Sequence, residues 1–281
     1  MKIALSIWSC HGYLENGQWT NADFIKFAAQ ETEAAGVELL TYFWKPEELE
    51  EVRGALTEHR MQVAAVGASN NFSHPDPQRR REEVAEILSA VNLAEAFGAR
   101  IVRVFAGDRP PDGYAFDEVK SWIVEGLREA AAAAAEKGIV LCLENHGIFA
   151  GKAAQVQAIL DEVGSPYLRS TFDTGNFLLV GEDPSAALEA LSPQVEHVHF
   201  KDFVPVDGSY EGRAYTGLTG ERFAGRIAGE GTIDLQGLIG RLHQDGYNGW
   251  LTVEYEGDDE QKHGAAGSIS NLARILRSLP A

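Results

Sequence analysis

The sequence predicts an α/β fold, a (β/α)8 TIM barrel formed as a single domain over residues 1–281. Short apolar runs alternate with longer amphipathic or alanine-rich stretches along the whole chain, as in strand–helix–strand units. Eight such units in about 250 residues is the size of a TIM barrel. The competing open doubly wound sheet is disfavoured because its phosphate-binding motifs, GxGxxG after a strand or GxxxxGK[ST], are missing from the sequence.

The expected strands are short apolar runs that end abruptly. They lie near residues 2–7, 37–40, 61–67, 100–105, 139–144, 168–173, 195–200 and 249–254. The expected helices lie near residues 21–35, 46–59, 76–97, 115–137, 151–163, 183–191, 233–246 and 263–278. Capping signals support two helix starts, Asn21 ahead of Asp23 and the Asp183-Pro184 pair. Glycines are expected at four helix ends, namely Gly36, Gly98, Gly138 and Gly246.

One long connection follows the seventh strand. Residues 201–232 are rich in glycine and in charges of both signs, and a connection of that length inside a compact domain is usually functional. We therefore expect this segment, the loop between the seventh strand and the seventh helix, to form a lid over the barrel mouth.

Charge and cysteine content limit the classes of function. With 24 basic and 42 acidic residues the formal charge is −18, which disfavours nucleic acid and anionic membranes as partners. Cys10 and Cys142 lack the spacing of a zinc ribbon or a CxxC pair and are interpreted as reduced thiols. The apolar start is too short for a signal peptide, and no window approaches the ~20 apolar residues of a membrane span. We expect a cytoplasmic protein with a small-molecule sugar substrate. The sequence leaves open whether the protein forms a homo-oligomer.

Four ionisable residues stand at the ends of the last four predicted strands. They are Glu144 in "CLENH", Asp173 in "STFDTGN", His199 in "HVHFKD" and Glu254 in "LTVEYEG". In a barrel these ends meet at one mouth, where three buried carboxylates without a counter-charge would cost several kcal/mol each. Any one of them alone is more simply a helix cap or a surface charge, but the set of four favours one divalent metal ion. The oxygen-rich donors suit Mn²⁺ first, with Mg²⁺, Co²⁺ or Zn²⁺ as alternatives.

Nearby residues are expected to support the metal or to bind substrate. His197 shares a face with His199, because side chains alternate along a strand, and is interpreted as a core or supporting residue. Trp8 is interpreted as wall packing, and Lys201 with Asp202 as a pair behind His199 or as solvated loop charges. The predicted substrate-binding residues, at or beyond strand ends or in the lid, are His11, Asn70, His146, Asn176, Lys201, Arg222 and Glu230.

The motifs "LENHG", "FDTGN", "HVHFKD", "GEGTIDL" and "GWLTVEYEG" resemble the xylose-isomerase-like TIM barrel superfamily, which contains sugar isomerases, ketose 3-epimerases, inosose dehydratases and endonuclease-IV-type enzymes. The resemblance implies that Glu144, Asp173, His199 and Glu254 bind one divalent metal, and that Glu144 and Glu254 also form the acid–base pair. The epimerases carry a histidine where this chain has Asn176, and an arginine shortly after the metal-binding histidine. Arg213 or Arg222 in the lid is expected to fill the place of that arginine. The endonucleases need a trinuclear zinc site with several more histidines than these motifs contain, so the resemblance to that branch is disfavoured.

Three hypotheses for function remain. The first is a divalent-metal-dependent isomerase or epimerase of a free sugar or ketose, with proton transfer through an enediolate between the two glutamates. The second is a metal-dependent lyase, a dehydratase or β-eliminating enzyme acting on a keto-sugar, keto-inositol or 3-keto-glycoside. The third is a sugar-binding barrel without catalysis.

Overall fold

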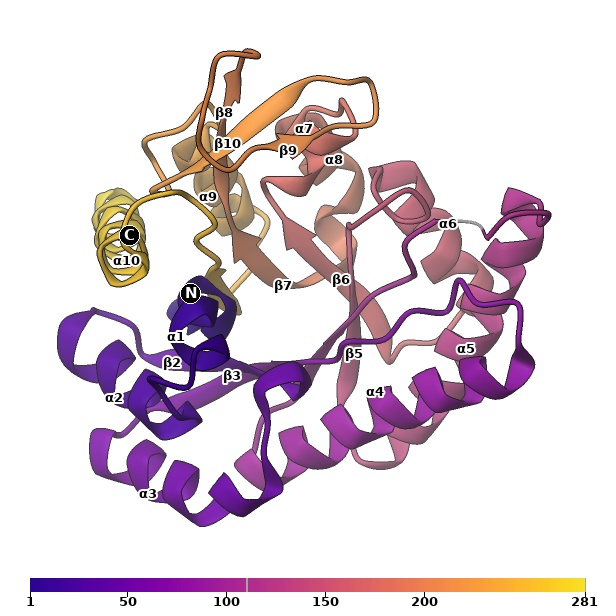
Figure 1. The fold of residues 1–281 in the computed structure, drawn as a ribbon, viewed down its shortest axis with the longest axis horizontal. Coiled ribbons are helices and arrows are strands. Elements are labelled where there is room, and N and C mark those ends of the chain that lie inside the picture. Colours follow the sequence, from indigo (N-terminus) through magenta and orange to yellow (C-terminus); the bar gives the residue numbers. More distant parts are fainter. Residues whose placement is uncertain (110, 281) are drawn as a thin grey trace.

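The computed structural model describes residues 1–109 and 111–280. Within these residues, eight parallel strands close into a barrel in the order β1-β11-β7-β6-β5-β4-β3-β2 (Figure 1). This closed ring confirms the predicted TIM barrel. Its strands are β1 (Lys2–Ser6), β2 (Gly36–Leu40), β3 (Gln62–Gly67), β4 (Ile101–Val104), β5 (Val140–Glu144), β6 (Leu168–Asp173), β7 (Val195–Phe200) and β11 (Trp250–Val253).

Helices surround the strands, as Figure 1 shows. The long ones are α2 (Asn21–Glu31), α3 (Leu49–His59), α4 (Pro77–Phe97), α5 (Phe116–Glu136), α6 (Ala153–Val163), α8 (Pro184–Leu191), α9 (Leu235–Gln244) and α10 (Gln261–Ser278). Two short helices, α1 (His11–Glu15) and α7 (Asn176–Leu179), follow the ends of β1 and β6. Because helices cover their outer faces, the barrel strands are apolar on both faces and appear in the sequence as unbroken apolar runs.

The start of α8 agrees with the predicted cap, since the Asp183 carboxylate accepts hydrogen bonds from two backbone N–H groups of the first turn. The start of α2 differs from the prediction. Thr20, not Asn21, is its N-cap, and Thr20 forms a capping box with Asp23.

The end of α2 also differs from the expectation of a helix reaching residue 35. The helix ends at Glu31, because Thr32 adopts an extended backbone and its hydroxyl donates to the Ala28 carbonyl. Gly36 is the first residue of β2 and does not terminate a helix. A Cβ atom there would lie 2.8 Å from the Gln62 carbonyl oxygen, so the close approach of two strands explains the glycine.

The segment expected to be a lid loop contains a small antiparallel sheet of its own. Its strands are β8 (Asp202–Val206), β9 (Tyr215–Thr216) and β10 (Arg222–Arg226), in the order β8-β10-β9. Figure 1 places this sheet beyond the end of β7, beside α7 and α8. The Asp202 carboxylate accepts hydrogen bonds from the N–H groups of Gly229, Gly231 and Ile233, which fixes the chain as it leaves β10. The Asp202 side chain therefore holds the segment after β10 and does not support His199.

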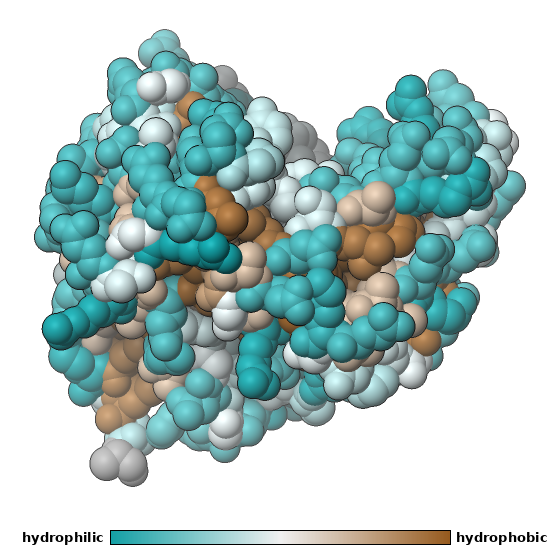
Figure 2. Space-filling view, turned by 90° about the horizontal axis from the view of Figure 1, so that it is seen from below, coloured by the Kyte–Doolittle hydropathy of each residue, from teal (hydrophilic) through white to brown (hydrophobic). Residues whose placement is uncertain are grey.

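Polar side chains cover most of the face seen in Figure 2, and hydrophobic surface is confined to strips between them. This distribution agrees with the charge of −18. Among the described helices, none combines the length and the apolar character that crossing a membrane requires.

Candidate active site and metal centre

The four predicted ligands lie together at the carboxyl ends of the strands. Glu144 and Asp173 are the last residues of β5 and β6, and His199 lies in β7 as the register partner of Asp173. Glu254 follows β11, and its N–H donates to the Phe200 carbonyl, so it continues the strand by one residue. All four are buried, and one donor atom from each lies within 4.8 Å of the donor atoms of the others.

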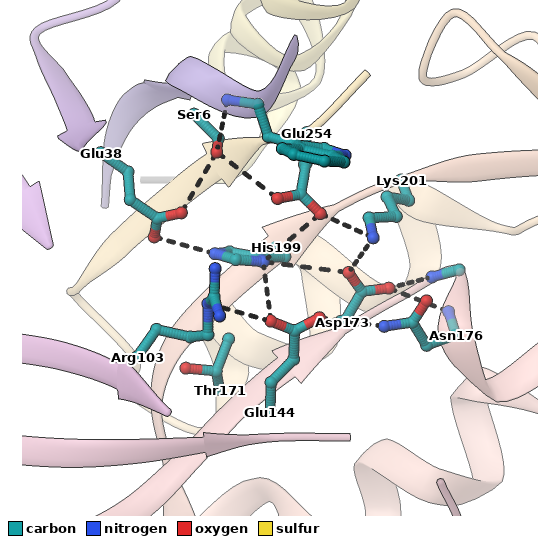
Figure 3. Close-up of polar contacts among 12 residues, drawn as sticks. Ser6, Glu38, Arg103, Glu144, Thr171, Asp173, Asn176, His199, Lys201 and Glu254 are labelled. Atoms are coloured by element: carbon teal, nitrogen blue, oxygen red, sulfur yellow. Dashed lines mark hydrogen bonds and ion pairs between the residues drawn. The ribbon is translucent and has the colours of Figure 1, made fainter. Parts of the chain in front are cut away.

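His199 is at the centre of this cluster (Figure 3). Its Nδ1 lies 3.6 Å from Glu144 Oε2, 3.9 Å from Asp173 Oδ2 and 3.9 Å from Glu254 Oε2. The Nδ1 atom of His199 and the Oδ2 atom of Asp173 are buried and form no hydrogen bond within the described residues. Buried polar atoms are almost always paired, so these two atoms aimed at a common point fit the coordination of a cation. Three carboxylates and one imidazole suit a hard divalent ion, in agreement with the predicted cofactor class.

Local hydrogen bonds orient Asp173. Its Oδ1 accepts from the N–H groups of Gly175 and Asn176, both at 2.9 Å, in the turn that leads into α7. The Asn145 side chain bridges to the main chain of Asp173, accepting from its N–H at 2.7 Å and donating to its carbonyl at 2.9 Å. The other carboxylate oxygen, Oδ2, is thereby left facing the cluster.

Two side-chain cations also compensate the carboxylates. Arg103 Nε lies 3.2 Å from Glu144 Oε2, on the side opposite Asn176, whose Nδ2 donates to Glu144 Oε1 at 3.0 Å. Lys201 Nζ lies 2.6 Å from Glu254 Oε2 and 3.3 Å from Asp173 Oδ2. Lys201 is therefore inside the carboxylate cluster and is not a solvated loop charge.

The pKa values of the cluster follow from burial and mutual charge. Burial raises the pKa of Asp173 to about 6, in spite of the opposing effect of Lys201. Burial also raises the pKa of Glu144, whereas for Glu254 the charges of Lys201 and His199 outweigh burial and lower the pKa. Burial alone would lower the pKa of His199, but Glu38 and Glu254 raise it to about 10. Without a metal, a proton on His199 supplies part of the positive charge that the cluster needs.

A cavity of about 520 Å³ opens beside the cluster. Glu144, Glu254 and three of the predicted substrate-binding residues, Asn70, His146 and Lys201, line it. Trp8 lines it too, with its Nε1 donating to Glu256 Oε1 at 2.7 Å.

A second cavity, of about 600 Å³, lies at the opposite end of the barrel, where Lys2, Gln62 and Trp250 begin their strands. Its lining within the described residues contains no histidine or carboxylate. The larger cavity therefore offers neither carboxylate nor imidazole ligands for a metal ion, and the cavity at the carboxyl ends is the candidate active site.

Four predicted substrate-binding residues lie outside the lining of this cavity. Asn176 is buried against Glu144, as described above. His11 begins α1, stacks on Trp8 with ring centroids 4.8 Å apart and approaches Gln261. Arg222 donates to the Asp207 carbonyl within the small antiparallel sheet, and Glu230 is exposed in the turn after β10. Arg222 and Glu230 lie outside the lining because the segment after β7 folds on itself and contributes no side chain beyond Lys201 to it.

Sequence reasoning missed two residues beneath the cluster, Ser6 on β1 and Glu38 on β2. Glu38 Oε2 lies 2.9 Å from His199 Nε2 and 3.0 Å from His197 Nε2. His197 thus has the supporting place expected of it. The signal that points to Glu38 is a charge inside the apolar run "VELL" of a strand buried along its whole length.

Comparisons with known proteins agree with the barrel fold. Residues 27–278 match the family described as xylose isomerase-like TIM barrel. An inosose dehydratase of Clostridium botulinum (strain Alaska E43 / Type E3) is 25% identical over 264 residues, covering 85% of this chain and 87% of that protein. The probable 3-DHS dehydratase of petrobactin synthesis from Bacillus anthracis superposes with a TM-score of 0.76 at 18% identity, covering 97% and 99% of the two chains. The 3-keto-D-glucoside 4-epimerase of E. coli superposes with a TM-score of 0.75 at 18% identity, covering 99% of each chain.

Proposed function

Because this chain belongs to the xylose isomerase-like TIM barrel family, we propose that it is a divalent-metal-dependent dehydratase acting on a keto-inositol or a related keto-sugar. The observation that carries the proposal is the inosose dehydratase relative, which aligns with this chain over most of both lengths. Because of this relative, we prefer the dehydratase hypothesis to the isomerase or epimerase that the sequence first favoured. Asn176 supports this order, since ketose 3-epimerases resembling this chain carry a histidine there.

The metal ion would be held by Glu144, Asp173, His199 and Glu254, whose donor atoms face one point. When bound, such an ion draws electrons from the substrate carbonyl and acidifies the neighbouring C–H bond. Manganese is the first candidate for a site of this composition, with magnesium, cobalt and zinc as alternatives.

Glu144 and Glu254 both line the cavity and are assigned the proton transfers. One glutamate removes the proton from the carbon beside the carbonyl, and the electrons of that C–H bond form a carbon–carbon double bond. The C–O bond at the next carbon breaks, and its hydroxyl leaves as water with a proton from the other glutamate. Exchange of one proton with solvent at each glutamate then restores the starting state. His146 and Lys201 also line the cavity and are further proton donors for the leaving hydroxyl.

The test is product analysis of the purified chain with Mn²⁺ and 2-keto-myo-inositol. Loss of one water between a carbon bearing a hydroxyl and its neighbour leaves the enol of a 1,2-diketone, which is visible as near-ultraviolet absorbance and as a mass smaller by one water. Chelation of the metal should abolish this product, and the Glu254→Gln substitution should strongly slow its formation.

A panel of free ketoses under the same conditions tests the second candidate, an epimerase or isomerase. That candidate is favoured by the position of two glutamates on one cavity, which suits removal and return of a proton without loss of a group. Formation of an epimeric or isomeric ketose, with no water lost from the keto-inositol, would overturn the dehydratase proposal.

A further inference from the structure

Glu38 is a buried carboxylate beneath the metal ligands, on the strand β2 that contributes no ligand of its own. Its side chain has no exposed surface. A single oxygen, Oε2, accepts from two imidazole rings, His199 Nε2 at 2.9 Å and His197 Nε2 at 3.0 Å. A carboxylate oxygen has two lone pairs, so these two N–H groups saturate it.

We propose that Glu38 is a positioning residue of the metal centre, which holds the Nε2–H of His199 and so directs Nδ1 at Glu144, Asp173 and Glu254. The inference rests on the proposed metal site. A neutral imidazole carries one N–H, and a ring that donates through Nε2 presents a lone pair at Nδ1. The Nδ1 atom of His199 is the one that faces the other three ligands and lacks a partner within the described residues. If the ring turned over, Glu38 would lose its hydrogen bond from His199 inside a dry core.

The support extends to a second ligand through Ser6. Ser6 and Glu38 are register partners on β1 and β2. The Ser6 hydroxyl lies 3.2 Å from Glu38 Oε1 and 3.4 Å from Glu254 Oε1 (Figure 3). One buried hydroxyl, with a single proton to donate, therefore lies between the carboxylate that holds His199 and the glutamate after the last strand.

His197 completes the arrangement from the layer below. It lies two residues before His199 on β7, and the two rings meet edge to face with centroids 5.2 Å apart. Both rings donate to the same oxygen, so any rotation of the Glu38 carboxylate toward one ring would lengthen its hydrogen bond from the other. Glu38, His197 and His199 could also be regarded as three ligands of a second ion, since their donor atoms lie within 4.8 Å of one another. The experiments below separate the two cases.

The first experiment measures Mn²⁺ binding to the metal-stripped protein by calorimetry. Ligand-supporting carboxylates commonly account for 10- to 100-fold in metal affinity. Glu38→Leu should weaken Mn²⁺ binding by roughly that factor, and Glu38→Gln, which keeps an acceptor oxygen, by less. Glu48→Gln is the matched control: Glu48 is also buried and also accepts hydrogen bonds, from Asn21 N and Nδ2, but lies away from the cluster. Its Mn²⁺ affinity should equal that of the wild type.

Equal Mn²⁺ affinity of the wild type and a folded Glu38→Leu variant would overturn the inference. So would two ions per wild-type chain with one lost in that variant, because Glu38 would then be a ligand. If Glu38→Leu does not fold, the comparison of Glu38→Gln with Glu48→Gln decides.

The second experiment reads the protons directly by ¹⁵N NMR of the histidine rings, with Zn²⁺ as a diamagnetic ion and His197→Gln to assign the two buried rings. In the wild type, His199 should show a slowly exchanging Nε2–H, and Zn²⁺ should shift Nδ1 but leave the Nε2 proton in place. A metal-bound Nε2, or no protected proton there, contradicts the inference. Failure of the wild type to bind any metal would refute the proposed function instead, and the Nε2–H signal of the metal-free protein would still test the contact with Glu38.

Discussion

Replacement of Lys201 by methionine tests how the metal-free protein tolerates its buried carboxylates. The ammonium group is buried, 2.6 Å from Glu254 Oε2, 3.3 Å from Asp173 Oδ2 and 3.6 Å from Glu256 Oε2. These neighbours raise the pKa of Lys201 well above its usual value against the opposing effect of burial, so the group is charged throughout the physiological range. Methionine keeps most of the volume of the side chain and removes only its charge.

The size of the effect follows from burial. Removing one partner of a buried ion pair typically costs about 3–5 kcal/mol, because an uncompensated charge remains in the interior. At roughly 2–4 °C per kcal/mol for a chain of this size, the metal-free variant should melt roughly 6–20 °C below the wild type. Lys137 is the matched control, with the same separation of 2.6 Å to Glu95 but in a solvent-exposed pair. Exposed pairs contribute about 0–1 kcal/mol, so Lys137→Met should melt close to the wild type.

Thermal unfolding with EDTA and with saturating Mn²⁺ is the assay. Because a divalent ion supplies the positive charge that the variant lacks, Mn²⁺ should raise the melting temperature of Lys201→Met more than that of the wild type. The reasoning is refuted if metal-free Lys201→Met melts as high as Lys137→Met, or if Mn²⁺ stabilises Lys201→Met less than the wild type.

Three further predictions concern catalysis, substrate entry and pH. Glu254→Gln should lower turnover by about 10²–10⁴-fold, the usual contribution of one acid–base group, while Mn²⁺ affinity by calorimetry falls only partly because three ligands remain. Tyr42 lines the cavity and is 62% exposed, so Tyr42→Ala should raise KM with little change in kcat, and its unfolding free energy should stay within about 0.5 kcal/mol of the wild type. Glu260 caps α10 by accepting hydrogen bonds from the N–H groups of Lys262 and His263. Burial is the largest single influence and raises the pKa of Glu260, but the hydrogen bonds from Tyr13 and from these N–H groups together outweigh it and lower the pKa. A lowered folded-state pKa means that this stabilisation is present above the unfolded value of about 4.3 and is lost as pH falls through the folded value, so the stability difference between wild type and Glu260→Gln should shrink in acid.

The barrel, and the meeting of four ionisable side chains at its mouth, were predictable because short local stretches of sequence determine both. Each strand is one apolar run, and a charged residue at the end of such a run marks the barrel mouth, as Glu144 and Asp173 do. Helix boundaries were less predictable where a side chain competes for the backbone, as the Thr32 hydroxyl does at the end of α2.

The surroundings of the ligands could not be predicted in the same way. Glu38 approaches His199 only because the barrel closes and brings the inner faces of β2 and β7 together, a contact between residues 161 positions apart. The small sheet of β8, β9 and β10 within the expected lid could not be predicted for another reason. Its strands are short and its glycines and mixed charges are typical of a loop, so no periodicity marks them.

The sources of the ligands and of their supports have a consequence for refolding. The proposed ligands lie in β5, β6 and β7 and directly after β11, whereas Ser6 and Glu38 belong to the first two strands. β1 meets β11 along the seam where the beginning and the end of the chain join, with Lys2 paired to Trp250. Until β1 pairs with β11, the Ser6 hydroxyl cannot contact Glu254, and Glu254 is not held near Glu38. High-affinity binding of the divalent ion should therefore come late in refolding, and it would report that the barrel has closed.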